Sequence, residues 1–233
     1  MAEKTLEQMR EAVEEIRAKM AAAAREAGRD PAAVQLCAAC KTRTAETVAA
    51  SAALPIDVFG ENHVQELCAN FDAGAYCGKP SHFIGHLQTN KIKKVLGRAS
   101  LIQSVGSEHL LTAIEKEAAK AGIVQNVLLE VNIGGEESKS GVSPDALEEL
   151  LLQIGQMSNV HVQGLMAIPP AAGSEKFLCE MQELYLDISA KKLDNIDMKI
   201  LSMGMSGDYA AAIRYGSTMV RIGSALFGAR KYT

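Results

Sequence analysis

The chain has 233 residues, 48% of them hydrophobic, which suits one domain over 1–233 with a large buried core and argues against a second large domain. Its formal net charge of -4 at pH 7 excludes a general attraction to polyphosphate, so we expect no nucleic-acid partner. Five scattered cysteines, a charged N-terminus that includes acidic residues, and the lack of any apolar run of about 18 residues argue against a disulfide framework, export and membrane insertion, and indicate a cytoplasmic protein.

The first thirty residues, 1–30, predict an N-terminal helix. Apolar residues recur there at steps of three and four among charged ones, at Leu6, Met9, Val13, Ile16 and Met20. Gly28, followed by Asp30 and Pro31, ends the pattern.

Beyond the N-terminal helix, short apolar runs alternate with helical patterns. The expected strands are 34–41, 56–62, 81–87, 100–105, 124–133, 160–168, 196–204 and 217–223. The expected helices lie near 45–53, 64–71, 89–97, 107–121, 144–155, 174–191 and 206–215, followed by a last short turn. Such spacing implies right-handed parallel crossovers, and eight units predict an α/β fold, a closed (β/α)8 TIM barrel with an extra N-terminal helix. An open doubly wound sheet is the alternative, although no Gly-rich dinucleotide motif follows any strand.

In such a barrel the C-terminal ends of the strands share one face, where ligands bind. The residues expected around that mouth are Lys41, Glu61, Asn62, 82–87, Asn132, 166–169, 202–206 and 221–224. Lys41 ends the run "LCAACK" and is either the first solvated residue after a buried strand or an amine held for chemistry. In a desolvated mouth a neutral lysine amine can form a Schiff base with an aldehyde.

Two turns of small residues follow the last two expected strands, in "LSMGMSGD" (201–208) and "VRIGSALFG" (220–228). Loops at these places in a barrel often bind phosphate, because glycines let backbone N–H groups approach and a helix N-terminus is partially positive. Ser206 and Ser224 add hydroxyl groups; the alternative is that Ser206 caps a helix and Gly223 allows tight packing. Arg221 has the strand parity to point into the mouth, and its alternative is a salt bridge to Asp208 or another carboxylate.

The cysteine and histidine pairs are weaker candidates for a metal site. Cys37 and Cys40 stand three apart on an expected strand and so point to opposite faces, which favours core packing. His82 and His86, with Cys77 nearby, lack a clear fourth ligand. We therefore expect no metal, and both histidines as polar residues at the barrel mouth.

Lys41 and the glycine turns belong to a longer series of motifs that runs from about residue 5 to the end. In order, they are "CKTR", "FGENHVQE", "HFIGHLQTNK", "EESKSGV", "GLMAIPP" and "SMGMSGDYAAAIRYGSTMVRIGSALFGAR". With these motifs the chain resembles the pyridoxal 5'-phosphate (PLP) homeostasis proteins. These are one-domain barrels of fold-type III, related to the N-terminal domain of alanine racemases.

The resemblance implies PLP bound as an internal aldimine on Lys41, with its phosphate held by Ser206 and by the backbone at Gly223 and Ser224. It also implies that Arg221 faces the pyridine nitrogen, while Asn62 and residues 84–85 border the ring. The chain departs from the residues common in the family at Cys40, His63 and His86, where Ser, Tyr and Pro are usual. Fine tuning and local loop shape are expected to differ there.

A guanidinium only donates hydrogen bonds, so at the pyridine nitrogen Arg221 favours the unprotonated form and a weaker electron sink. The expected function is therefore PLP binding that serves vitamin B6 and amino-acid homeostasis, without strong catalytic turnover. PLP-dependent apo-enzymes are the expected recipients, and the protein is expected to be a monomer. One alternative is an amino-acid racemase or related PLP enzyme using Lys41 and a mouth residue such as His82. If the resemblance is set aside, a second alternative is an enzyme of phosphorylated metabolites in which Lys41 reacts with a sugar aldehyde.

Overall fold

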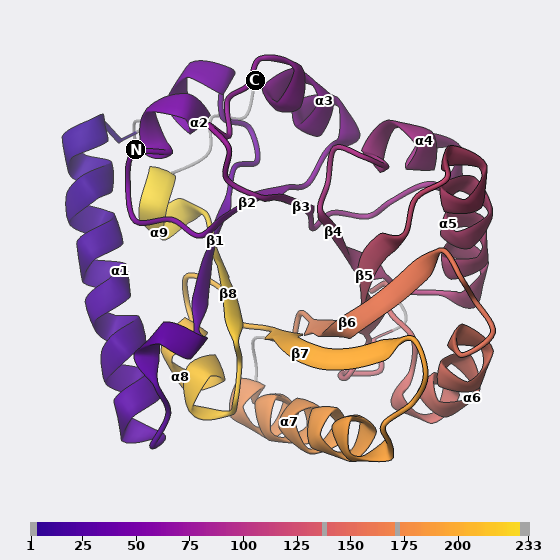
Figure 1. Cartoon of the computed structure of the whole chain (residues 1–233). Coiled ribbons are helices and arrows are strands. Elements are labelled where there is room, and N and C mark those ends of the chain that lie inside the picture. The colour runs from indigo at the N-terminus through magenta and orange to yellow at the C-terminus, as the bar shows by residue number, and fades with distance from the viewer. Residues whose placement is uncertain (1–3, 137–138, 171–172, 229–233) are drawn as a thin grey trace.

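The computed structural model of the chain describes residues 4–136, 139–170 and 173–228. Eight strands in these residues pair in parallel and close into a barrel in chain order (Figure 1). They are β1 (Gln35–Ala39), β2 (Val58–Glu61), β3 (Ser81–Phe83), β4 (Leu101–Val105), β5 (Gln125–Val131), β6 (Val160–Ala167), β7 (Ile196–Ser202) and β8 (Met219–Ile222). The predicted closed barrel is confirmed, and the open sheet is wrong.

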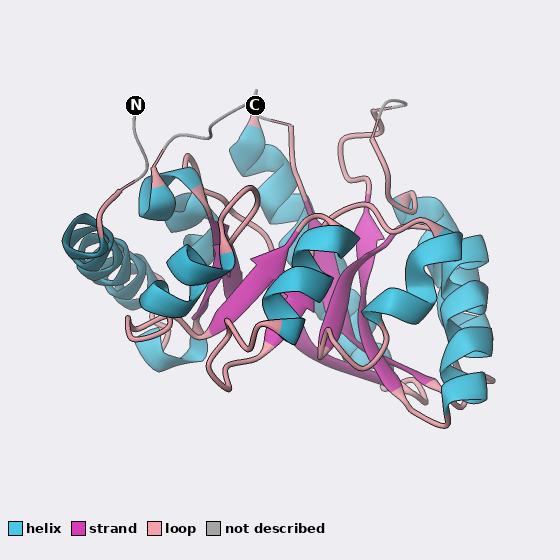
Figure 2. Cartoon of the chain, turned by 90° about the horizontal axis from the view of Figure 1, so that it is seen from above, coloured by secondary structure: helices cyan, strands magenta, loops and turns pink. Residues whose placement is uncertain are grey.

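Helices cover the outside of the barrel, and Figure 2 shows them on both sides of the strands. In the described residues they are α1 (Leu6–Glu26), α2 (Ala45–Ser51), α3 (Val64–Asp72), α4 (Ile92–Val95), α5 (Glu108–Ala121), α6 (Pro144–Ile154), α7 (Ser174–Lys191), α8 (Tyr209–Arg214) and α9 (Ser224–Phe227). Two 3-10 turns are also present: η1 (Pro31–Ala33) lies between α1 and β1, and η2 (Thr89–Lys91) lies between β3 and α4. Among the helices described, none combines the length and the apolar character that crossing a membrane requires.

The N-terminal helix α1 is fixed by local signals at its start and by packing along its length. Thr5 and Gln8 form a capping box, in which each side chain accepts the other residue's backbone N–H. Four of the five residues predicted for its apolar face, Met9, Val13, Ile16 and Met20, are buried, whereas Leu6 is 40% exposed. The helix packs against α8 and α9. Lys4 donates from its amine to the Ala225 carbonyl at 2.6 Å and from its backbone N–H to the Phe227 carbonyl at 3.1 Å. The start of the chain is thereby bonded to α9, the helix that follows the last strand.

The barrel wall separates two sets of side chains, as the two-residue period of a strand requires. On β1, Leu36 and Ala38 belong to the large core between strands and helices, whereas Cys37 packs inside the barrel with Met219. Cys37 and Cys40 are free, buried and on opposite sides of this wall, so the prediction of core packing is confirmed.

Closure of the barrel brings β1 beside β8. Cys37 pairs with Arg221 and Ala38 with Ile222. Val220 and Ile222 lie in the outer core and Met219 inside, so Arg221 has the inward parity predicted for it. The residues that follow these two strands therefore meet at one rim.

The strand β6 bends at Gly164, where its register against β7 shifts. The φ of Gly164 is 141°, and a Cβ built there would lie 1.8 Å from the carbonyl oxygen of Ile200. Only glycine allows this conformation and this close approach of two backbones.

Among the element boundaries that differ from the sequence expectations, two change where candidate site residues lie. β3 ends at Phe83 rather than near 87, so His86 lies in the loop and His82 lies below the rim. α8 begins at Tyr209 with Asp208 at its N-cap position, so the expected helix start near 206 is wrong and Ser206 does not cap it.

Candidate functional site

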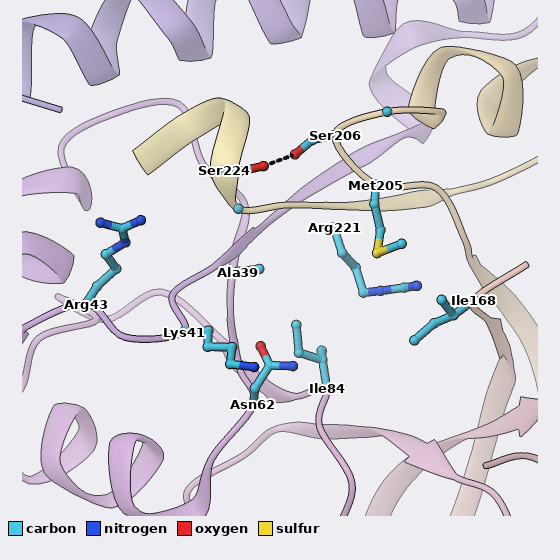
Figure 3. Close-up of a pocket in the computed structure, with 12 residues that line it drawn as sticks. Ala39, Lys41, Arg43, Asn62, Ile84, Ile168, Met205, Ser206, Arg221 and Ser224 are labelled. Carbon is cyan, nitrogen blue, oxygen red and sulfur yellow. Dashed lines mark hydrogen bonds between the residues drawn. The ribbon is translucent and has the colours of Figure 1, made fainter. Parts of the chain in front are cut away.

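A pocket of about 330 Å³ opens at the C-terminal rim of the strands, between the ends of β1, β2 and β8 (Figure 3). Its lining consists of Ala39, Lys41, Arg43, Asn62, Ile84, Ile168, Met205, Ser206, Gly207, Arg221, Gly223 and Ser224. The six residues proposed from the sequence to hold a cofactor are all in this set. The volume suits a small organic ligand, since such pockets measure about 300–1,000 Å³.

Lys41 is positioned by a tight turn directly after β1. Thr42 adopts the left-handed conformation with φ 66°, which is uncommon for a β-branched residue, and its N–H donates to Oε1 of Glu66 at 3.1 Å. The N–H of Arg43 donates to the Cys40 carbonyl at 2.8 Å and closes the turn. Figure 3 shows the Lys41 amine inside the pocket, beside the Asn62 side chain. This half-buried lysine therefore faces the cavity, which favours the chemical interpretation of its place at the strand end.

The other side of the pocket is formed by the turns after β7 and β8. The hydroxyl of Ser206 accepts the Ala225 N–H at 3.3 Å and lies 3.3 Å from the hydroxyl of Ser224 (Figure 3). The backbone N–H groups of Ser206 and Gly207 have no acceptor among the described residues. Two hydroxyl groups and two free N–H groups suit an anion with several oxygen atoms, such as a phosphate.

Arg221 lies between the lysine and the serine turns in Figure 3. Its guanidinium donates to the carbonyl and hydroxyl oxygens of Ser202 at 2.8 and 2.7 Å and to the Ala167 carbonyl at 2.9 Å. Asp208 instead accepts the Met205 N–H at 2.7 Å, so the predicted alternative of a salt bridge to Asp208 is wrong. Burial lowers the pKa of Arg221, but an arginine keeps its charge in proteins. The pocket thus contains a fixed cation that can only donate.

The amine, the cation and the anion-binding turns fit the group that the sequence resemblance implies. An aldehyde can reach Lys41, a phosphate can be bound at Ser206 and Ser224, and a ring nitrogen that accepts a hydrogen bond can meet Arg221.

Some lining residues were not singled out from the sequence. Arg43 is buried, donates to the Gly228 carbonyl at 2.8 Å and lies over the Phe227 ring at 5.6 Å. Its position two residues after Lys41, in the same turn, was the signal that could have indicated it. Ile168 and Met205, which belong to the ranges 166–169 and 202–206 expected at the mouth, form an apolar edge to the pocket and are 39% and 41% exposed.

Several residues expected at the mouth lie outside this pocket; of these, His82 and Glu61 are corrections, because their side chains are buried away from it. His82 is buried in the barrel interior, where burial lowers its pKa to about 3 and its Nδ1 lies 2.9 Å from Nε2 of Gln103. It therefore does not serve as the mouth base of the racemase alternative. His86 lines a separate pocket with Glu130. Glu61 accepts from Asn70 and Tyr76. The described part of the chain contains no cluster of three or more His, Cys, Asp or Glu suited to a metal.

Residues 8–231 match the family model of the alanine racemase N-terminal domain. The chain is 41% identical over 210 residues to the pyridoxal phosphate homeostasis protein of Aquifex aeolicus, an alignment that covers 88% of this chain and 91% of that protein.

Two solved structures share the fold and a substantial part of the sequence. A protein of Bifidobacterium adolescentis superposes with a TM-score of 0.89 at 35% identity, over 95% of both chains. PipY of Synechococcus elongatus, solved with PLP bound, superposes with a TM-score of 0.77 at 28% identity, over 91% of this chain and 100% of that one.

Proposed function

The chain belongs to the pyridoxal phosphate homeostasis protein family, and on this premise we propose that it binds PLP through Lys41 and serves vitamin B6 and amino-acid homeostasis. The observation that carries the proposal is the convergence of a primary amine, a guanidinium and anion-binding turns in one pocket. The presence of PLP in the similar PipY structure supports it.

PLP, when bound, supplies an aldehyde and an electron-withdrawing pyridine ring. Lys41 offers the amine that captures the aldehyde. The hydroxyl groups of Ser206 and Ser224, with the backbone at Gly223, hold the phosphate. Arg221 donates toward the ring nitrogen, and Asn62 borders the ring.

The composition of the pocket supports a carrier rather than an enzyme with strong turnover. Lys41 is the single lysine among the described lining residues, which include no His, Tyr, Asp or Glu. Racemisation removes a proton from one face of a carbon and returns one to the other, which calls for a second acid or base. A donor-only Arg221 further weakens the electron sink. Reversible capture and release of an aldehyde needs neither group.

The proposed recipients of the released cofactor are PLP-dependent apo-enzymes. An incoming amine can take the aldehyde from Lys41, which makes exchange with another protein's lysine or with an amino acid chemically direct. We propose that this exchange takes place in the cytoplasm and that the protein acts as a monomer.

Replacement of Lys41 tests the attachment site. Lys41→Ala should abolish the visible absorbance of PLP-loaded protein and the borohydride-stable mass increase, whereas Lys116→Ala, at an exposed position on α5, should keep both. Peptide mapping of the reduced protein should place the adduct on Lys41. An adduct that persists on another lysine in Lys41→Ala contradicts the assignment.

A second experiment separates a carrier from an enzyme. Loaded protein is mixed with a PLP-free aminotransferase, and in parallel with a panel of amino acids in deuterium oxide. Restored aminotransferase activity without sustained deuterium exchange at the α-carbon supports the carrier. Sustained exchange that is lost in Lys41→Ala supports a racemase or related enzyme instead.

A further inference from the structure

A chain of buried polar side chains crosses the barrel interior beneath the pocket. It starts at Arg221 on β8 and passes through Ser202 on β7 and Gln103 on β4 to His82 on β3. Gln103 and Ser202 are fully buried and His82 is 6% exposed. Of these four residues, only Arg221 lines the pocket. Any effect of the other three on a bound ligand must therefore pass through the arginine.

The direction of every hydrogen bond in this chain follows from the arginine. A guanidinium has no acceptor, so the Ser202 hydroxyl accepts from Nη1 of Arg221 at 2.7 Å. The one proton of that hydroxyl is then donated to Oε1 of Gln103 at 2.7 Å. This fixes the Gln103 amide with Nε2 toward Nδ1 of His82, 2.9 Å away, and toward the sulfur of Met219. His82 must therefore be neutral and accept at Nδ1, a state that burial also favours.

These bonds, with those to the two backbone carbonyls, occupy one side of the guanidinium. Nη1 uses both of its hydrogens on Ser202, and Nη2 uses one on the Ala167 carbonyl. The N–H of Nε and the second N–H of Nη2 have no acceptor among the described residues. Because Arg221 lines the pocket, this free edge is available to a group bound there.

We propose that Gln103 is a positioning residue, which together with Ser202 and His82 holds the Arg221 guanidinium so that its free edge meets the ring nitrogen of PLP. Acceptors without charge suit this role. A carboxylate in place of Gln103 or Ser202 would neutralise the guanidinium, whereas amide, hydroxyl and imidazole groups fix its direction and leave its charge for the ligand. The proposal deepens the proposed function and depends on PLP binding in this pocket.

The test compares two buried glutamines on adjacent strands. Gln103→Met keeps the length of the side chain and removes its hydrogen bonds. Gln125→Met makes the same change on β5, where Nε2 donates only to the Ala99 and Asn126 carbonyls. Each protein is titrated with PLP and with its 1-deaza analogue, which keeps the aldehyde and phosphate but has a C–H in place of the ring nitrogen.

Gln103→Met should weaken PLP binding by about threefold to tenfold, the effect of one impaired hydrogen bond to a charged donor, and should leave the affinity for the deaza analogue unchanged. Gln125→Met should change neither affinity. Equal losses for both ligands, or no loss for PLP, would overturn the role of Gln103. If Gln103→Met does not fold, Gln103→Asn replaces it. It keeps a neutral amide but is one methylene too short to span Ser202 and His82, so it should also lower the preference for PLP over the analogue; an unchanged preference would overturn the proposal.

A measurement on the protein without ligand separates this proposal from the proposed function. The Nε–H signal of Arg221 in a nitrogen-15 NMR spectrum, assigned by its absence in Arg221→Lys, should exchange faster with water in Gln103→Met than in Gln125→Met. An unmodified protein that binds no PLP would refute the proposed function, and the NMR comparison would still report on the network. An Arg221 signal that is the same in both glutamine variants would refute the positioning role even where PLP binds.

Discussion

Glu61→Gln should stabilise the folded protein at neutral and alkaline pH. Glu61 is fully buried at the end of β2, where Oε1 accepts from Nδ2 of Asn70 at 2.7 Å and from the hydroxyl of Tyr76 at 3.0 Å. Its second oxygen, Oε2, is buried without a hydrogen-bond partner. Burial raises the pKa of this carboxyl from 4.5 to about 7, because an ionised carboxylate loses its hydration there.

The magnitude follows from the two pKa values. In the unfolded chain Glu61 ionises near pH 4.5, whereas in the folded chain it stays protonated up to about pH 7. Between these values the folded state binds more protons, so the free energy of unfolding falls as the pH rises, and the loss is complete above the folded pKa. At about 1.4 kcal/mol per pKa unit, the loss amounts to about 3 kcal/mol at pH 8. A glutamine resembles the protonated acid, so Glu61→Gln should recover most of this energy at pH 8 and little at pH 4.

Urea denaturation of both proteins at pH 4, 6 and 8 measures this difference directly. Glu14→Gln, at an exposed position on α1, makes the same change of net charge and should leave the pH dependence almost unaltered. If the difference in unfolding free energy between Glu61→Gln and the unmodified protein is the same at all three pH values, the buried carboxyl does not titrate as described.

Three further predictions concern the pocket, the barrel wall and the interior. Ser206→Ala should weaken PLP binding by about 1 kcal/mol or more, because only PLP carries the phosphate. Pyridoxal binding, titrated in parallel, should be nearly unchanged. Equal losses for both ligands would remove Ser206 from the phosphate site. Gly164→Ala should lower the free energy of unfolding, measured by urea denaturation, by about 3 kcal/mol or more, because its Cβ would overlap the Ile200 carbonyl. Gly155→Ala is the control, since its Cβ would meet its nearest atom at 3.6 Å, and it should be close to neutral. Similar values for both variants would contradict the close approach at Gly164. Burial lowers the pKa of His82 from 6.5 to about 3, so the protein should lose up to about 5 kcal/mol of unfolding free energy as the pH falls through this range. His82→Gln should make the unfolding free energy depend less on pH between these values. An unchanged pH dependence there would show that His82 is not buried in its neutral form.

Strand parity and order were sufficient to predict much of the site. Alternating apolar runs and helices indicated the barrel, and the barrel then placed Lys41 and the turns after the last two strands at one rim. The inward direction of Arg221 followed from its apolar neighbours Val220 and Ile222, which occupy the outer core.

The position of His82 was mispredicted because strand ends are poorly defined by sequence. The apolar run continues past Phe83, but the strand does not. Ile84 takes the place at the pocket, and His82, two residues earlier and of the same parity, lies one layer deeper.

The buried network could not be found from local pattern at all. Gln103 and Ser202 stand almost a hundred positions apart on strands that are not neighbours, and their contact exists only across the closed barrel. Ser206 illustrates a related difficulty, since its partner is the backbone of the following unit rather than that of its own helix.

Pairing of the first strand with the last has a consequence for the order of events during synthesis. A ribosome releases Lys41 early, but the arginine and the serine turns that complete its surroundings emerge only with the final segment. A growing polypeptide therefore carries a reactive amine without the groups that would select one aldehyde over another. On the proposed function, PLP can be held by the complete set of contacts only after β1 has paired with β8.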